Sequence, residues 1–187
     1  MATDNSNLEI KIKLREYFIS LIDSPVILET HAGETRQLYH ACYEKYNTTS
    51  LDIKSIKGVI KCDNKKYIAS ENMSRYNIFD IDAYGDPYTL FVNIVHRMSP
   101  HQKKVFFLTD GLHRNLIYGS CPGILLTAMN NPKNIDIPCL NRHHEHLVKL
   151  FLQKTCKEYS LKVYDCKIAR DESVNKMLYI ALFCEKT

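Results

Sequence analysis

The apolar positions of this chain change repeatedly between two spacings, which predicts helices and strands in alternation. Residues 8–22 carry apolar side chains at a helical spacing, and Asp23-Ser24-Pro25 interrupts this pattern. A short apolar run at 26–28 is typical of a buried strand. The same reasoning predicts helices at 37–46, 89–98 and 142–159, a short helix or loop at 122–130, and strands at 48–53, 66–70, 76–81, 104–109, 161–168 and 177–184.

The order of these segments predicts an α/β fold built on a mostly parallel sheet. Strands that alternate with helices pair in parallel, and the helices then cover both faces of the sheet. Only about eight residues separate the last two predicted strands. This connection is too short for a crossover helix, so we expect the C-terminal strand to be antiparallel. Residues 1–24 are expected to form an N-terminal helical extension.

The composition is that of an ordinary globular protein. The chain has 187 residues, of which 45% are hydrophobic and 25% charged, and this length favours one domain over residues 1–187. No apolar run reaches the ~18 residues that a membrane span requires. The seven cysteines include no C-x-x-C pair, so we expect reduced thiols in a cytoplasmic protein. The net charge of +4 fits a nucleic-acid partner, but it fits many other partners as well.

The first strand leads into a loop of small residues. Glu29 ends the strand, and His31-Ala32-Gly33-Glu34-Thr35 follows. Ala32 and Gly33 would let the backbone approach a ligand closely. The complete G-x-G-x-x-G fingerprint is absent, which argues against a dinucleotide. An ordinary strand-to-helix turn is the alternative.

Acids also follow later strands. Asp52 ends the second strand, 23 residues after Glu29, at about the distance at which an acid accepts hydrogen bonds from ribose hydroxyls. Asp80 and Asp82 flank Ile81 on a buried strand, where two carboxylates are costly unless they are functional or paired. The loop at 110–114 follows the fifth parallel strand, so it should lie at the same sheet edge as Asp82.

Residues 79–87 read FDIDAYGDP. This segment resembles the D-x-D-P-F/Y-G-x-P loop of the tRNA guanine-N2 dimethyltransferases, with Ala83 in place of a proline. The resemblance implies that Asp82 accepts a hydrogen bond or proton from an exocyclic amine. It also implies that Tyr84 stacks on a flipped base and that Pro87 belongs to the catalytic loop.

The wider pattern is similar to the class I S-adenosylmethionine-dependent methyltransferases, whose parallel strands also end in an antiparallel hairpin. Flavodoxin-like and nicotinamide-binding folds do not end this way. The resemblance implies a three-layer Rossmann-like methyltransferase fold with seven strands, and S-adenosyl-L-methionine as the cofactor. It also implies a loop at Asn72 and Met73 that contacts adenine. The implied cofactor-binding residues are Glu29, His31, Ala32, Gly33, Thr35, Asp52, Asn72, Met73 and Asp80.

Several alternatives remain open at this point. Asp86-Pro87-Tyr88 also resembles the D-P-P-Y loop of amino methyltransferases, with one proline missing. This alignment and the one to the tRNA dimethyltransferases both imply an exocyclic amine as acceptor. A nucleic acid is the expected substrate, RNA before DNA, with a homodimer or a partner subunit as a further expectation. The other hypotheses are a methyltransferase of small molecules or proteins, and a non-catalytic binding protein with this fold. His143 and His146 lie on one helix face, but a solvated helix start is favoured over a metal site.

Overall fold

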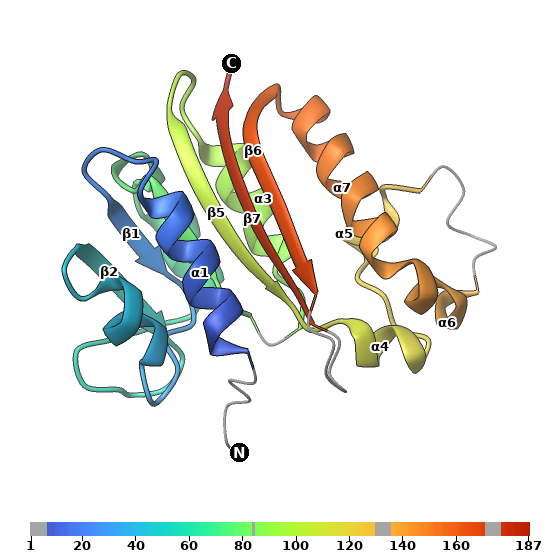
Figure 1. Cartoon of the computed structure of the whole chain (residues 1–187), viewed down its shortest axis with the longest axis horizontal. Coiled ribbons are helices and arrows are strands. Elements are labelled where there is room, and N and C mark those ends of the chain that lie inside the picture. The colour runs from blue at the N-terminus through green and yellow to red at the C-terminus, as the bar shows by residue number, and fades with distance from the viewer. Residues whose placement is uncertain (1–6, 84, 130–135, 171–176) are drawn as a thin grey trace.

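The computed structural model describes residues 7–83, 85–129, 136–170 and 177–187. Within them seven strands form one sheet in the order β3-β2-β1-β4-β5-β7-β6 (Figure 1). β1 to β5 pair in parallel, and β7 is antiparallel to both β5 and β6, which confirms the predicted antiparallel C-terminal strand. The strands are β1 (Val26–Glu29), β2 (Asn47–Asp52), β3 (Ile60–Lys61), β4 (Ile78–Ile81), β5 (Lys103–Asp110), β6 (Leu161–Arg170) and β7 (Leu178–Lys186).

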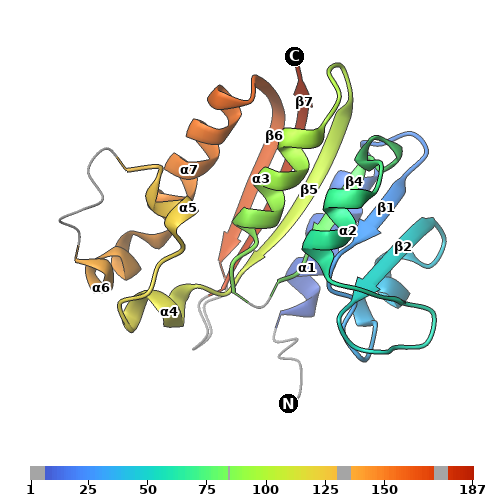
Figure 2. The same cartoon turned by 180° about the vertical axis from the view of Figure 1, so that it is seen from behind.

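Helices lie on both faces of this sheet. α1 (Leu8–Ile19) and the π-helical turn η1 (Tyr39–Tyr43) share one face, whereas α2 (Asn64–Ser70), α3 (Tyr88–Arg97) and α7 (His144–Glu158) pack on the other (Figures 1 and 2). The shorter elements are α4 (His113–Ile117), α5 (Gly123–Leu126), α6 (Ile137–Leu140), η2 (Met73–Arg75) and η4 (Asn141–His143).

The core consists of two layers, one on each side of the sheet, because strand residues alternate between its faces. On β4, Ile78 packs on the α1 side with Phe18, and Phe79 packs on the α3 side. Phe79 stacks on Phe106 with ring centroids 5.2 Å apart, and the edge of Phe91 meets Phe106 at 4.9 Å. These fully buried rings fix the height of α3 above the central strands.

The predicted strand at 66–70 is wrong. These residues belong to α2, which begins at Asn64 because the Asp63 side chain accepts hydrogen bonds from the backbone N–H groups of Lys65 and Lys66. The third strand is instead the short pair Ile60–Lys61, which the sequence pattern did not reveal because both residues are exposed.

This error also changes the place of the expected adenine loop. Asn72 and Met73 follow a helix and lead into β4, so they lie near the amino ends of the strands, opposite the acids. Met73 is buried in the core, and the Asn72 side chain accepts a hydrogen bond from the Ser74 backbone N–H at 3.0 Å. Both side chains therefore have structural roles, and the structure does not bring them to the other predicted cofactor residues.

The seven cysteines form no disulfide bond, and Cys42 and Cys184 are buried. Burial raises the pKa of the Cys42 thiol to about 11, so it stays protonated near neutral pH. Among the described helices, none combines the length and the apolar character that crossing a membrane demands.

Candidate active site

Carboxylates gather at the carboxyl edge of the sheet. Glu29 and Asp80 are direct register partners on the parallel strands β1 and β4, and Asp52 and Asp110 are the last residues of β2 and β5. Asp82 follows β4 by one residue. Asp110 and Asp82 therefore lie at one edge of the sheet, as predicted, and Glu29 and Asp52 end their strands at the same edge. This edge is where open α/β sheets bind ligands.

Glu29 is buried with one carboxyl oxygen free of partners. Its side chain is 1% exposed, and among the described residues Oε2 has no hydrogen-bond donor. Burial raises the pKa of Glu29 to about 7, a hydrogen bond from Ser50 opposes this rise, and the charge of Asp80 adds to it. A buried acceptor without a donor is costly, so Glu29 is suited to receive a donor from a ligand.

The loop after β1 is held open against the end of β2. The Gly33 backbone N–H donates to Oδ2 of Asp52 at 3.1 Å, and the Lys54 N–H donates to Oδ1 at 2.8 Å. Gly33 has φ +66°, a left-handed conformation that favours glycine, and a Cβ built there would meet no atom within 4 Å. Open space therefore faces this backbone turn, as a ligand that approaches the main chain requires.

His31 joins the β1 loop to the start of α2. Its Nδ1 lies 2.8 Å from Oγ1 of Thr30, and its Nε2 lies 3.1 Å from Nδ2 of Asn64. Burial lowers the pKa of His31, which favours the neutral ring. Because the Asn64 amide can only donate through Nδ2, the ring accepts at Nε2 and carries its proton on Nδ1. Thr35, by contrast, is exposed and belongs to the turn that follows.

Asp80 is not available to a cofactor, which corrects its predicted role. Its side chain is fully buried, and Arg15 of α1 donates to both of its carboxylate oxygens, from Nε to Oδ2 at 3.0 Å and from Nη2 to Oδ1 at 2.7 Å. Tyr43 of η1 donates a further hydrogen bond to Oδ2 at 2.5 Å. Both carboxylate oxygens of Asp80 are thus fully used by contacts within the protein.

Asp82 is also paired, but its side chain keeps 16% of its surface exposed. Lys11 of α1 donates from Nζ to both carboxylate oxygens at 2.8 Å. Burial pushes the pKa of Asp82 upward, yet the charges of Lys11 and Arg15 outweigh it and hold the pKa below the ordinary value. Asp82 is therefore an ionised carboxylate whose remaining lone pairs can accept from a ligand.

Sequence reasoning missed Lys11 and Arg15 because both look like exposed basic residues of an amphipathic helix. Their signal lay in their spacing, since Lys11, Arg15 and Phe18 repeat at i, i+4 and i+7 on one face. All three are buried in the structure. Two cations on the apolar face of a helix indicate buried carboxylates opposite.

The loop after Asp82 leads into α3. Tyr84 lies outside the described residues, and Pro87 directly precedes the first turn of α3. Asp86 caps that turn, because its carboxylate accepts from the Tyr88 N–H at 2.8 Å and from the Thr89 hydroxyl at 2.7 Å. The alternative D-P-P-Y alignment does not fit this geometry, because the Tyr88 ring is fully buried and cannot stack on a base.

A second buried acid ends β5. Asp110 accepts a hydrogen bond from the Tyr88 hydroxyl, and its Oδ2 lies 2.8 Å from Nε2 of His144 in the first turn of α7. Asp110, Tyr88 and His144 are all fully buried. This contact fixes the start of α7 at the same sheet edge as Asp82.

Comparisons by sequence find no matching family model and no matching curated protein. Solved structures are nevertheless similar over nearly the whole chain. TYW2 from M. jannaschii, in complex with AdoMet, has a TM-score of 0.53 at 10% identity, with 100% of this chain and 79% of that chain covered. Trm1 from Pyrococcus horikoshii, in complex with S-adenosyl-L-methionine, has a TM-score of 0.59 at 12% identity.

The match to Trm1 covers 100% of this chain but only 56% of that chain. The N-methyltransferase NodS from Bradyrhizobium japonicum, in complex with S-adenosyl-L-homocysteine, has a TM-score of 0.50 at 13% identity, with 98% of this chain and 90% of that chain covered. Identities this low establish the fold, and they agree with the strand order and the antiparallel β7. The chain therefore has the three-layer Rossmann-like fold of the class I S-adenosylmethionine-dependent methyltransferases.

Proposed function

We propose that this protein is a S-adenosylmethionine-dependent methyltransferase that modifies an exocyclic amine of a nucleic-acid base. The observation that carries the proposal is the buried Oε2 of Glu29, which has no partner among the described residues and belongs to the last residue of the strand that leads into the open backbone turn at Gly33. A cationic, hydrogen-bonding ligand would satisfy this oxygen, and the missing Cβ leaves room for it. The site thus fits S-adenosylmethionine, which carries an ammonium group, a sulfonium and two ribose hydroxyls.

Each residue at the carboxyl edge of the sheet would contact a different part of such a cofactor. Glu29 would accept from the ammonium group directly or through water, and the loop around Ala32 and Gly33 would contact the methionine part. Asp52 would accept from the ribose hydroxyls with the lone pairs that Gly33 and Lys54 leave unused. The two acids Glu29 and Asp52 also give the site a charge complementary to the cationic cofactor.

When bound, S-adenosylmethionine would supply an electrophilic methyl group for the amine nitrogen, and the amine would lose its proton to solvent. Asp82 orients the amine by accepting a hydrogen bond from one of its N–H groups. Since its pKa is held low, Asp82 acts by orientation and by stabilising the positive charge that develops on nitrogen, more than by removing a proton.

The motif at 79–87 and the structural likeness to Trm1 support a nucleic-acid base as acceptor, and the positive net charge agrees with it. NodS is named an N-methyltransferase, so the likeness to it supports a nitrogen atom as the methyl acceptor.

Calorimetry with S-adenosylmethionine and S-adenosylhomocysteine tests the cofactor. Binding should be lost in Asp52→Asn and kept in Asp23→Asn, which removes an exposed acid before β1, at the opposite edge of the sheet. If neither compound binds the wild type, both the catalytic and the cofactor-binding hypotheses fail.

Transfer of a tritiated methyl group to total RNA, to DNA and to a metabolite extract then identifies the acceptor. Asp82→Ala should abolish transfer and leave cofactor binding nearly intact. Removal of Asp82 alone leaves the Lys11 ammonium buried without its partner, so Lys11→Met/Asp82→Ala is measured beside it. Transfer only to the extract would overturn the nucleic-acid acceptor, and cofactor binding without any transfer would favour a binding protein.

A further inference from the structure

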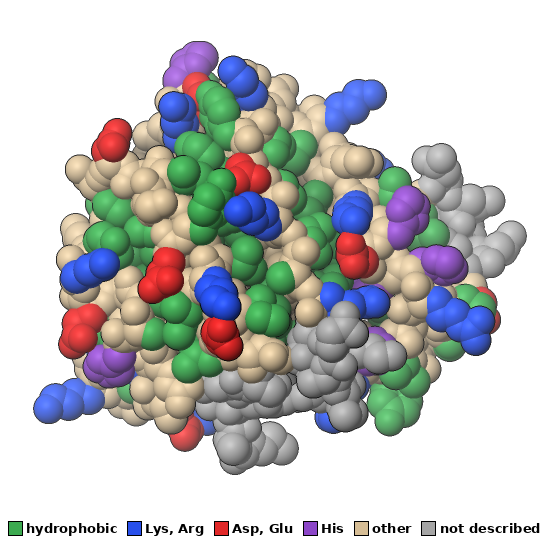
Figure 3. All heavy atoms as spheres, in the orientation of Figure 1, with side chains coloured by type: hydrophobic (Ala, Val, Ile, Leu, Met, Phe, Trp, Pro, Cys, Tyr) green, Lys and Arg blue, Asp and Glu red, His purple; other side chains and the backbone are tan. Residues whose placement is uncertain are grey.

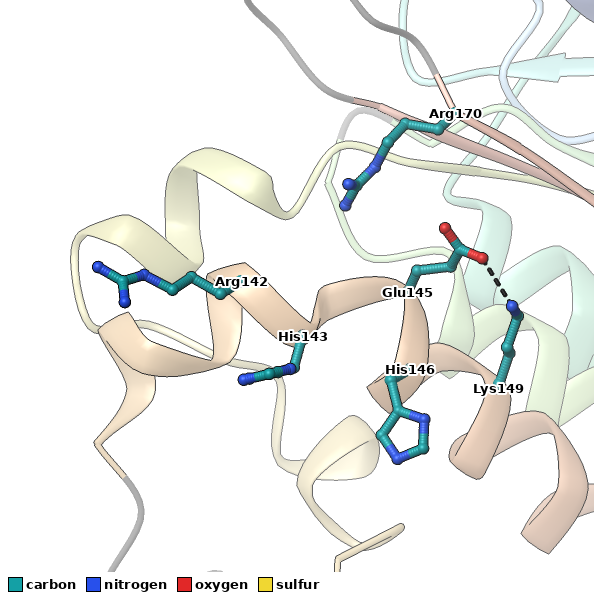
Figure 4. A pocket seen from close by; sticks show the side chains of 6 residues that line it. All are labelled: Arg142, His143, Glu145, His146, Lys149 and Arg170. Carbon is teal, nitrogen blue, oxygen red and sulfur yellow. Dashed lines mark ion pairs between the residues drawn. The ribbon is translucent and has the colours of Figure 1, made fainter.

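A basic pocket of about 260 Å³ opens at the start of α7. Side chains from η4, α7 and β6 surround it, and Figure 4 shows Arg170 reaching across from β6 toward the helix. Its lining residues are Arg142, His143, Glu145, His146, Lys149 and Arg170. In Figure 3, histidine and Lys or Arg side chains gather on the side of the molecule that holds α6 and α7.

The described side chains of this pocket carry an excess of positive charge. Among these lining residues the only carboxylate is that of Glu145, which pairs with Lys149 at 2.7 Å, and the charge of Arg170 also helps to lower the pKa of Glu145. In the described part of the chain Arg142 and Arg170 form no salt bridge, and the buried Nε of Arg170 has no hydrogen-bond acceptor. Within the described ranges neither guanidinium group therefore has a salt-bridge partner.

A metal ion does not account for these residues. Within the described ranges no group of three or more His, Cys, Asp or Glu side chains is placed to hold one. Guanidinium groups repel cations and pair with carboxylates and phosphates through two parallel hydrogen bonds. The chemistry of the pocket therefore indicates an oxyanion.

The pocket lies at the same sheet edge as Asp82. Arg170 and Asp110 are both register partners of Leu178, so the three residues form one row across β6, β7 and β5. His144, between two lining residues, is bonded to Asp110. Three strand spacings separate β6 from β4, which places the Arg170 backbone about 14 Å from that of Asp82 along the sheet. A strand of a few nucleotides spans this distance. Asp82 turns toward α1 and Arg170 toward α7, so the bound strand would cross the carboxyl edge of the sheet.

We propose that this pocket binds a backbone phosphate of the nucleic-acid strand whose base reaches Asp82. The inference rests on the proposed function, because it takes the acceptor to be a polynucleotide. Arg170 contacts the phosphate, Arg142 adds positive charge at the far rim of the pocket, the imidazoles of His143 and His146 border it, and Lys149 pairs with the Glu145 carboxylate. The positions of Arg170 and of the first turn of α7 are fixed by β7 and by the buried Asp110.

Fluorescence anisotropy with a short, labelled single-stranded RNA tests this pocket without any need for methyl transfer. Loss of a charge-assisted contact corresponds to about tenfold or more in affinity, so Arg142→Ala/Arg170→Ala should weaken binding by at least that factor. The slope of log affinity against log salt should fall by about 0.7 for each phosphate contact removed. Lys162→Ala is the control, since it removes an exposed charge from the amino end of β6 and should change neither value.

The outcomes separate the pocket from the proposed function. Unchanged RNA affinity and salt slope in the double variant, with cofactor binding intact, would overturn the phosphate site while the methyltransferase proposal stands. Competition by inorganic phosphate at concentrations near the RNA dissociation constant would also overturn it, because it would indicate a site for a small free phosphate. Equal binding of DNA and RNA supports it, since the contact is to the backbone. Circular dichroism of each variant checks that the fold is kept.

Discussion

Arg15 and Asp80 form a bidentate ion pair that lies wholly beneath α1, with the guanidinium 2% exposed and the carboxylate inaccessible. The pair joins the first helix of the described chain to the central strand, and Tyr43 completes its hydrogen bonds. Lys11, one turn earlier, makes the corresponding contact with Asp82. The helix before β1 thus supplies the counter-charges of the acids at the active-site edge.

Arg15→Met should destabilise the protein by about 3–5 kcal/mol, because it leaves the Asp80 carboxylate buried and unpaired. Urea denaturation measures the free energy of unfolding. Lys13→Met, on the exposed side of the same helix, is the control and should keep the wild-type midpoint. The double variant Arg15→Met/Asp80→Leu should recover part of the loss, and an equal loss in single and double variants would contradict a coupled pair.

Lys11→Met should raise the pKa of Asp82 above its ordinary value, because burial remains while the nearest cation is removed. In the wild type the folded pKa is depressed. The pair therefore stabilises the protein at neutral pH, and this contribution is lost as the pH falls below about 4. Carboxyl-carbon NMR titration measures the shift, with Asp82→Asn to identify the resonance. A pKa that stays low in Lys11→Met would show that Arg15 alone sets it.

Glu29→Gln should change how stability depends on pH. Burial raises the pKa of Glu29 to about 7 in the folded chain, against 4.5 as the ordinary value. Between these values the folded state holds more protons than the unfolded state, so the free energy of unfolding falls as the pH rises. Relative to wild type, the variant should gain about 3 kcal/mol between about pH 4 and about pH 8. Parallel denaturation curves at these pH values measure this gain, and a constant difference would contradict it.

Gly33→Ala should separate folding from ligand binding. The left-handed backbone costs an alanine about 1–2 kcal/mol, and the added methyl group meets no protein atom but enters the open space proposed for the cofactor. Gly119→Ala is a matched control, with φ +77° and equally open surroundings beyond α4. Both variants should lose similar stability, and only Gly33→Ala should lose affinity for S-adenosylhomocysteine in calorimetry.

His144→Leu should loosen the first turn of α7, because it removes one of the partners that keep Asp110 buried. We expect a destabilisation of about 3 kcal/mol and faster hydrogen exchange in that turn. His146→Leu, on the exposed side of the same helix, should change neither. If the first turn of α7 exchanges its amide hydrogens at the wild-type rate in His144→Leu, the hydrogen bonds from the Tyr88 hydroxyl and the Leu112 N–H are enough to hold Asp110 in place.

Local sequence patterns were enough to predict the alternation of helices and strands, the antiparallel end of the sheet and the shared edge of Asp82 and the loop at 110–114. These features follow from local patterns, since apolar spacing reports which side of each segment is buried and parallel strands bring their carboxyl ends together. The prediction failed at 66–70, where a helix capped by Asp63 contains a short run that looked like a strand.

Tertiary structure alone decided which partner each buried charge has. Lys11 and Asp82 are 71 residues apart in sequence, Arg15 and Asp80 are 65 apart, and His144 and Asp110 are 34 apart. A local pattern shows that a carboxylate on a buried strand needs a partner, but the helix that brings the cation is chosen by packing across the whole sheet. The same packing inserts β7 between β5 and β6 and thereby aligns Arg170 with Asp110 at the edge where the acids lie.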